Sequence, residues 1–137
     1  MEIEEYGNPA SDIVLIQPVD EHDLALIENE ITAIADNSDK DFRLIAVKVD
    51  DWNTDLSPWQ APAVFGKDAF GGEARDTLSA ILPLCEDKSK AYCIGGYSLA
   101  GLFALWAAYQ TDAFSGVAAV SPSVWFPGWS AYAREHV

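Results

Sequence analysis

The chain has 137 residues and a formal net charge of −14, and half of its residues are hydrophobic. This length and composition predict one soluble globular domain, and the acidic charge disfavours binding to nucleic acid or anionic membranes. No apolar run approaches the ~20 residues of a membrane span, and the acidic N-terminus does not resemble a signal peptide. We therefore expect a cytoplasmic protein.

Strands and helices alternate in the first half of the chain. A β-branched run predicts a buried strand over 13–17, which Pro18 ends. Apolar residues at helical spacing predict an amphipathic helix over 21–36, and a second apolar run predicts a strand over 42–49. The segment 50–72 is rich in aromatic residues and turn formers, and we expect an irregular loop with a functional role.

The same alternation continues in the second half. A helix is predicted over 73–85, with Pro83 kinking or shortening its last turn. A short apolar strand over 91–94 leads into a helix over 99–111, which is apolar on nearly all sides and is therefore expected to be buried. A fourth strand is predicted over 117–121, followed by an aromatic segment.

The order βαβαβαβ predicts the fold class. Apolar strands that alternate with helices are typical of an α/β protein, with a parallel sheet covered by helices on both faces. We expect residues 1–137 to form a single domain of this kind. Functional sites in such sheets lie at the carboxyl ends of the strands. Ser98, the loop that follows Val49 and the aromatic segment that follows Ser121 all fall at that edge.

The sequence around Ser98 predicts a nucleophile elbow, in which a tight turn between a strand and a helix presents a serine hydroxyl. The motif G-x-S-x-G is nearly matched, because Gly96 precedes Ser98 by two residues while Ala100 and then Gly101 follow it. The backbone N–H of Leu99 would then stabilise an oxyanion at the amino end of the helix. The alternative is a serine that only caps the helix.

A second oxyanion donor is expected from the loop after the first predicted strand. Pro18 has no N–H, so Val19 is the first candidate and Asp20 the next.

Two motifs together resemble a known family. The run Gly96–Leu105, then Phe114 and then the run Ser121–Trp125, with the sequence S-P-S-V-W, are similar to the enterochelin-esterase-like branch of the α/β-hydrolases. The similarity is dense over about 91–129 and looser, but consistent in element order, over about 13–90.

The resemblance implies an α/β-hydrolase fold and a carboxylic ester hydrolase. It implies that Ser98 is the nucleophile, that the Leu99 N–H belongs to the oxyanion hole and that Trp125 lies beside the substrate pocket. Two residues depart from the family pattern, Ala100 in place of glycine and Phe126 in place of a second tryptophan. The second departure leaves the substrate open.

The acid and base that such a serine needs are not evident. In this superfamily they follow the serine on later loops. After Ser98 the chain offers Asp112, at the far end of the following helix, and Glu135 and His136 at its end. His22 precedes the serine, which is the wrong position for this superfamily. We therefore expect the N-terminal portion of an α/β-hydrolase domain, incomplete at the C-terminus and lacking the later strands.

Three functions remain open. The first is a serine esterase that forms an acyl-enzyme on Ser98 and acts on an uncharged or weakly charged small-molecule ester, with Trp52 and Trp125 at a hydrophobic rim. The second is a non-catalytic binding domain with the hydrolase architecture. The third is a catalytically incomplete fragment that associates with a second chain through the exposed edge of its last strand.

No metal and no cofactor are expected. The two cysteines, Cys85 and Cys93, lack metal-ligand spacing, and the chain has no phosphate-binding or dinucleotide-binding glycine motif.

Overall fold

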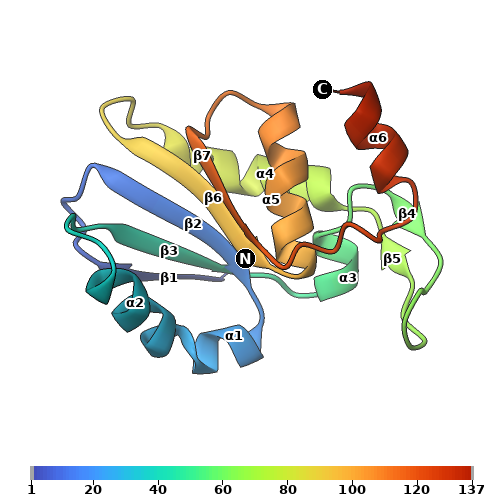
Figure 1. Cartoon of the computed structure of the whole chain (residues 1–137), viewed down its shortest axis with the longest axis horizontal. Coiled ribbons are helices and arrows are strands. Elements are labelled where there is room, and N and C mark those ends of the chain that lie inside the picture. The colour runs from blue at the N-terminus through green and yellow to red at the C-terminus, as the bar shows by residue number, and fades with distance from the viewer. Residues whose placement is uncertain (1, 137) are drawn as a thin grey trace.

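The computed structural model describes residues 2–136 and has one main sheet of five strands in the order β1-β3-β2-β6-β7 (Figure 1). The strands β2, β3, β6 and β7 are parallel, and β1 is antiparallel to β3 at one edge. Their bounds are β1 Glu2–Gly7, β2 Ile13–Val19, β3 Arg43–Lys48, β6 Ala91–Tyr97 and β7 Gly116–Val120. The four predicted strands and the α/β class are therefore confirmed.

The predicted end of the first strand at Pro18 is wrong, because β2 continues to Val19. Proline lacks the N–H that a central strand needs for pairing. β2 pairs with β6 only as far as Ile16, whereas its pairing with β3 continues to Val19. The Val19 carbonyl accepts from Val49 on the β3 side, so the nitrogen of the adjacent Pro18 faces the other side, where the pairing with β6 has already ended. Its missing N–H therefore leaves no gap in a ladder.

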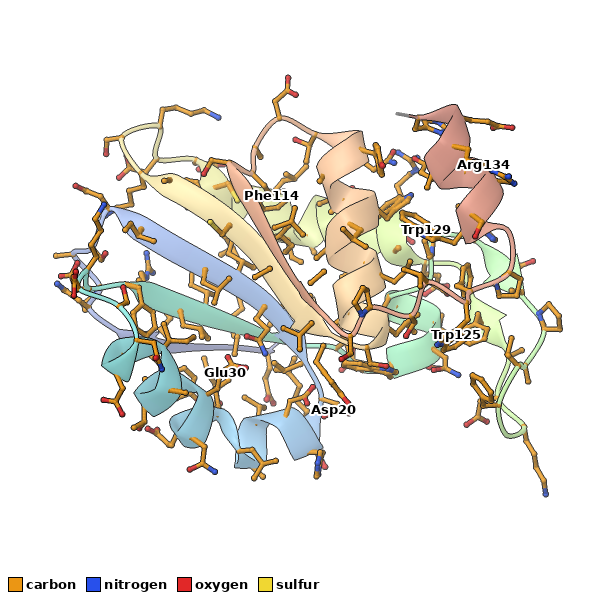
Figure 2. The ribbon with its side chains drawn as sticks, in the orientation of Figure 1. Asp20, Glu30, Phe114, Trp125, Trp129 and Arg134 are labelled. Carbon is orange, nitrogen blue, oxygen red and sulfur yellow. The ribbon has the colours of Figure 1, made fainter. Side chains whose placement is uncertain are left out.

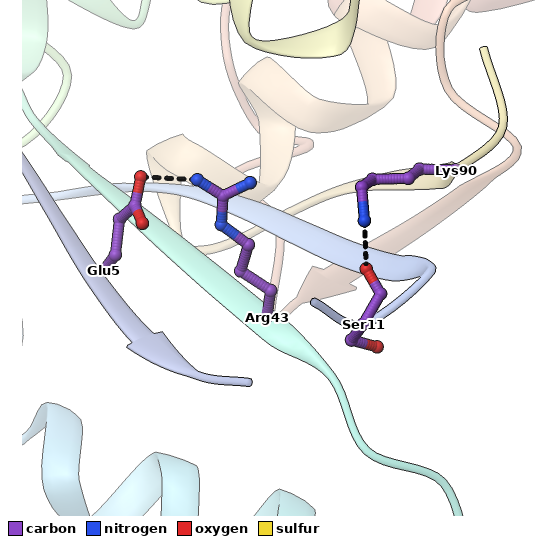
Figure 3. Close-up of polar contacts among 4 residues, drawn as sticks. All are labelled: Glu5, Ser11, Arg43 and Lys90. Atoms are coloured by element: carbon purple, nitrogen blue, oxygen red, sulfur yellow. Dashed lines mark hydrogen bonds and ion pairs between the residues drawn. The ribbon is translucent and has the colours of Figure 1, made fainter. Parts of the chain in front are cut away.

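Strand β1 was not predicted, because its sequence is acidic and lacks a buried face. All but one of its residues are exposed. It is held by its pairing with β3 and by an ion pair in which Arg43 lies 2.6 Å from the Glu5 carboxylate (Figure 3). At the same end of the sheet, the Lys90 ammonium donates a hydrogen bond of 2.8 Å to the Ser11 carbonyl, which ties the turn before β6 to the turn before β2.

The helix predicted over 21–36 is divided into α1 (Glu21–Ala25) and α2 (Ile27–Asp36). Leu26 separates them with φ −109° and ψ 4°, and its N–H bonds to the Asp23 carbonyl in a tight turn. The apolar stripe of both helices still faces the sheet, where it covers a small core made with β2 and β3.

The segment 50–72 is more ordered than the predicted loop. It contains the helix α3 (Trp52–Asp55) and a short hairpin of β4 (Gln60–Ala61) and β5 (Phe70–Gly71). The Ser57 hydroxyl organises this segment, since it donates to the Asn53 carbonyl at 2.6 Å and accepts from the Gly72 N–H at 2.8 Å.

Three further helices follow. The helix α4 (Ala74–Ile81) ends in a 3₁₀ turn, η1 (Leu82–Cys85), so the predicted effect of Pro83 is confirmed. The helix α5 (Leu99–Gln110) is buried along most of its length, as predicted. A short helix, α6 (Trp129–Glu135), forms within the aromatic segment and was not predicted. None of the helices within residues 2–136 is both long and apolar enough to cross a membrane.

The two faces of the sheet are covered unequally. The larger core lies between one face and the helices α4 and α5, and α6 packs against α5 farther from the sheet (Figure 1). On the other face, the small core under α1 and α2 involves β2 and β3, while every residue of the outer strand β7 is at least partly exposed. Helices lie on both faces, but α1 and α2 leave the β6–β7 part of their face open.

Candidate active site

Ser98 occupies a strained turn between β6 and α5. Its φ of 60° and ψ of −118° are rare for a residue other than glycine, and such a conformation costs about 1–3 kcal/mol. The surrounding backbone holds it. The Ser98 N–H donates to the Val120 carbonyl at 3.0 Å, and the Ser98 carbonyl accepts from Ser123 at 3.1 Å and from Leu102 at 3.1 Å. The carboxyl ends of β6 and β7 and the first turn of α5 therefore fix the serine together.

Small residues make this turn possible. A Cβ at Gly96 would lie 2.6 Å from the Cβ of Ala100, which is too close for any side chain. A Cβ at Gly101 would lie 3.2 Å from both the Gly96 carbonyl oxygen and Pro122 Cα. The start of α5 therefore packs directly on the backbone of the strand ends, and Ala100 fits where the family motif has glycine.

The Ser98 hydroxyl does not cap α5, which disfavours the alternative reading of this residue. Instead, its Oγ lies 3.2 Å from the Oγ of Ser123, and either atom can donate. Ser123 is 1% exposed and follows Ser121, which also has a positive φ of 43°. Sequence reasoning gave Ser123 no role, although the S-P-S motif after a strand at the same edge was a signal for it.

The three candidate backbone donors to an oxyanion, Leu99, Val19 and Asp20, lie in different structural settings. Leu99 is the first residue of α5 and directly follows Ser98, as the motif requires. Val19 is the last residue of β2, is fully buried and pairs in register with Lys48. The Asp20 N–H bonds to the Asp23 carboxylate at 3.3 Å in the capping box of α1. Val19 thus stays a prediction, and the Asp20 donor is already engaged.

The two rim tryptophans lie on different elements. Trp125 is 45% exposed, lies two residues after Ser123, and packs against Phe65 and Phe70 of the β4–β5 hairpin with ring centroids 5.0 and 6.1 Å apart (Figure 2). Trp52 begins α3 and lines a polar cavity of about 340 Å³ together with Asp20 and other residues after β2 and β3. Trp125 therefore offers an exposed aromatic surface close in sequence to the serine pair.

The candidate acids and bases are dispersed. Asp112 is exposed beyond the far end of α5, about 20 Å from its start at 1.5 Å per residue. His136 stacks on Tyr132 at a centroid distance of 4.0 Å, and its Nδ1 lies 2.8 Å from the Tyr132 carbonyl. His22 is exposed on α1. Glu135 is exposed at the end of α6. Among residues 2–136, the hydroxyl partner of Ser98 is Ser123 rather than an imidazole.

Comparison with known proteins supports the fold. No family model and no curated protein matches the sequence. A solved structure, the siderophore hydrolase EstA from Aspergillus nidulans, is similar to this chain with a TM-score of 0.69 and 23% sequence identity. The similarity covers 97% of this chain and 56% of that chain, so this chain spans about half the length of that hydrolase. Residues 2–136 therefore share the α/β fold of the matched part of that hydrolase, in agreement with the fold that the sequence predicted.

Proposed function

We propose that this chain carries the nucleophile and one oxyanion donor of a serine esterase, with Ser98 forming the acyl-enzyme. The observation that carries this proposal is the strained, uncapped Ser98 between a parallel strand and a buried helix. Strain of this kind persists where the surrounding structure imposes it, and it is concentrated at functional sites. The name of the structural neighbour, a siderophore hydrolase, supports the same reaction class.

The proposed reaction begins with attack of Ser98 Oγ on the carbonyl carbon of an ester. The carbonyl oxygen becomes an oxyanion, which the Leu99 N–H and the positive end of α5 stabilise. The serine proton passes to a base and then to the departing alcohol, which leaves an acyl group on Ser98. Water then attacks the acyl carbon, releases the carboxylic acid and restores the hydroxyl. Val19 remains the proposed source of the second oxyanion donor.

The substrate class follows from the rim of the site. Trp125 packs with Phe65 and Phe70 and follows Ser123 by two residues, and an aromatic surface of this kind would suit an apolar or aromatic acyl or alcohol group. The net charge of −14 disfavours strongly anionic esters. We therefore propose an uncharged or weakly charged ester with an apolar group, and a further contribution from Trp52 on α3.

The second candidate function is a hydrolase-like domain without activity of its own. The pairing of Ser98 with Ser123 favours it, because a serine hydroxyl is not a base at neutral pH. Removing the base from a serine enzyme leaves only the acceleration that oxyanion stabilisation and binding provide.

A fluorophosphonate probe distinguishes these functions. The probe forms a covalent adduct with an activated serine, which intact mass spectrometry detects. We expect one adduct on the wild-type chain and none on Ser98→Ala. Ser121→Ala is the matched control, because Ser121 lies exposed at the same edge, and it should label like the wild type. Ser123→Ala should still label but at a several-fold changed rate, since it removes the hydroxyl that contacts Ser98. A folded wild-type chain that never labels would exclude the esterase and favour the inactive domain.

A further inference from the structure

The hydroxyl of Ser123 is buried and contacts one partner. The residue is 1% exposed, and among residues 2–136 its Oγ makes one hydrogen-bond contact, with Ser98 Oγ at 3.2 Å. The backbone imposes this approach. The Ser123 N–H donates to the Ser98 carbonyl at 3.1 Å, and the N–H of the buried Phe126 donates to the Ser123 carbonyl at 3.0 Å. Main-chain hydrogen bonds therefore hold the two hydroxyls next to each other.

The burial of Ser123 indicates which of the two hydroxyls donates. A serine hydroxyl has one hydrogen to donate and two lone pairs that accept. If Ser98 donated, the buried hydrogen of Ser123 would have no acceptor among residues 2–136, which costs free energy. If Ser123 donates, its hydrogen is satisfied, and Ser98 is only half-buried and can direct its own hydrogen elsewhere. Donation from Ser123 to Ser98 Oγ is therefore favoured.

We propose that Ser123 is a positioning residue whose hydroxyl donates to the nucleophile, orients it and stabilises negative charge on Ser98 Oγ. This inference rests on the proposed function of Ser98. During acylation, Ser98 loses its proton to the base as the bond from Oγ to the acyl carbon forms, and Ser123 keeps its own proton. A hydrogen bond becomes shorter and stronger when its acceptor is charged. The distance of 3.2 Å exceeds the common value of about 2.7–2.8 Å, which leaves room for that shortening.

The donor role gives the serine pair a part in catalysis. Ser123 cannot take the proton of Ser98 as a base at neutral pH, but a Ser123 hydroxyl that donates leaves that proton available to a base. The same donor would act in deacylation, when the bond from Oγ to the acyl carbon breaks and Oγ gains charge before it recovers a proton. The Leu99 N–H is proposed to stabilise the carbonyl oxygen of the substrate, so the two donors act on different atoms.

A thiol in place of the Ser98 hydroxyl tests the donor without any catalysis. The Ser98→Cys variant puts a titratable group at this position, and a hydrogen bond donated to its thiolate lowers the thiol pKa. We expect Ser123→Ala, added to Ser98→Cys, to raise that pKa by about one pH unit. The measurement is the rate of alkylation across a pH series, whose midpoint reports the pKa. Peptide mapping separates this thiol from Cys85 and Cys93.

Ser121→Ala is the matched control for the titration. Ser121 lies two residues before Ser123 and is exposed, so its loss should leave the midpoint unchanged. The proposal is overturned if Ser123→Ala leaves the midpoint where it was or lowers it. It is also overturned if Ser121→Ala raises the midpoint as much as Ser123→Ala does, because the effect would then not come from a hydroxyl in contact with position 98.

Thermal unfolding of alanine variants gives a second test of the direction of donation. Ser98→Ala leaves the buried Ser123 hydroxyl without its acceptor, so it should lower the Tm by about 3–6 °C. In the Ser123→Ala background the same substitution should lower the Tm by about 1 °C or less, because no buried donor is left behind. Equal losses of Tm in the two backgrounds would overturn the proposal.

Fluorophosphonate labelling separates this inference from the esterase proposal. If the wild-type chain labels, Ser123→Ala should label several-fold more slowly and Ser121→Ala at the wild-type rate. Labelling that Ser123→Ala leaves unchanged would overturn the donor role and keep the esterase. A wild-type chain that never labels would exclude the esterase, while a raised thiol pKa in the Ser98→Cys background would still confirm that Ser123 donates.

Discussion

The two faces of the same sheet differ in what covers them. On the α5 side, Phe103, Trp106 and Phe126 are at most 3% exposed and belong to one continuous core. On the other side, Tyr97 and Val120 are more than half exposed, although they belong to the same strands β6 and β7. An apolar strand therefore shows which residues can be buried, and the neighbouring helices decide which of them are. The candidate nucleophile Ser98 lies at the start of α5, the helix on the closed face, where the backbone is held by hydrogen bonds to Val120, Ser123 and Leu102.

Paired aromatic truncations give the largest expected difference between the faces. Phe103→Ala removes a fully buried ring and should lower the free energy of unfolding by about 3–5 kcal/mol. Tyr97→Ala removes a ring that is largely exposed and should cost less than about 1 kcal/mol. Urea denaturation followed by circular dichroism measures both. If Tyr97→Ala costs as much as Phe103→Ala, the open face is packed in solution and the comparison fails.

The fold was predictable where the sequence shows strong local patterns. The four parallel strands are continuous apolar runs, and α5 is apolar on nearly all sides because it is buried along most of its length. Strand β1 was missed because an edge strand with exposed side chains shows no apolar pattern. The open face was missed for a related reason, since the same apolar residues would occur in β6 and β7 whether or not a helix covered them.

Two glycines on opposite faces of β6 provide the next test. Gly96→Ala places a Cβ 2.6 Å from Ala100 under the first turn of α5 and should cost about 1–3 kcal/mol of stability. Gly95→Ala places a Cβ 3.1 Å from the Ala118 carbonyl oxygen on the open side, where the edge strand β7 can shift by a few tenths of an ångström. We expect it to cost less than about 1 kcal/mol.

Thermal unfolding measures the loss of stability in each of the two glycine variants. Fluorophosphonate labelling of Ser98 adds a functional readout. Gly96→Ala should also distort the turn at Ser98 and slow labelling, while Gly95→Ala should not. Equal losses of stability in both variants would show that the two sides of β6 are packed alike.

The candidate site was predictable only in part. The motif around Ser98 placed the serine at a strand-to-helix turn because glycine spacing reflects a local steric need. Ser123 contacts Ser98 across 25 residues, and no local pattern encodes that approach. The positions of β6 and β7 side by side create it, since the backbone of Ser98 bonds to both Val120 and Ser123. Residue spacing along the sequence predicts local contacts. It does not predict contacts such as this one, which depend on which strands are neighbours in the sheet.

The two cysteines lie on opposite sides of the sheet, so the reactivity of their thiols should differ between the closed and the open face. Cys85 is 4% exposed in the larger core, and burial raises the pKa of its thiol, with Lys88 opposing this to a smaller extent. Cys93 is half-buried and belongs to the open side of β6. We expect Cys93 to react with a thiol reagent at least about tenfold faster than Cys85 at neutral pH, because Cys93 is more accessible and because burial keeps the Cys85 thiol protonated. Peptide mapping after timed alkylation measures this, and equal rates would contradict it.

The smallest expected effect is at Glu30 on α2, the helix that borders the open face. Burial raises the pKa of Glu30 above its ordinary value, a contribution from Asp23 adds to this, and the Gln17 hydrogen bond opposes it. The folded chain therefore binds the proton more tightly than the unfolded chain, so stability falls as the pH rises through the folded pKa. The cost of the ionised carboxylate is fully present at neutral pH and disappears when the pH falls below the ordinary glutamate pKa.

Glu30→Gln should therefore raise the Tm of the free chain at pH 7 by about 2–3 °C, and this gain should vanish near pH 4. Glu28→Gln lowers the overall negative charge equally, so the gain of Glu30→Gln over Glu28→Gln isolates the buried position. Differential scanning fluorimetry at both pH values measures it. A Tm that falls in Glu30→Gln at pH 7 would mean that the carboxylate already has a partner in the free chain.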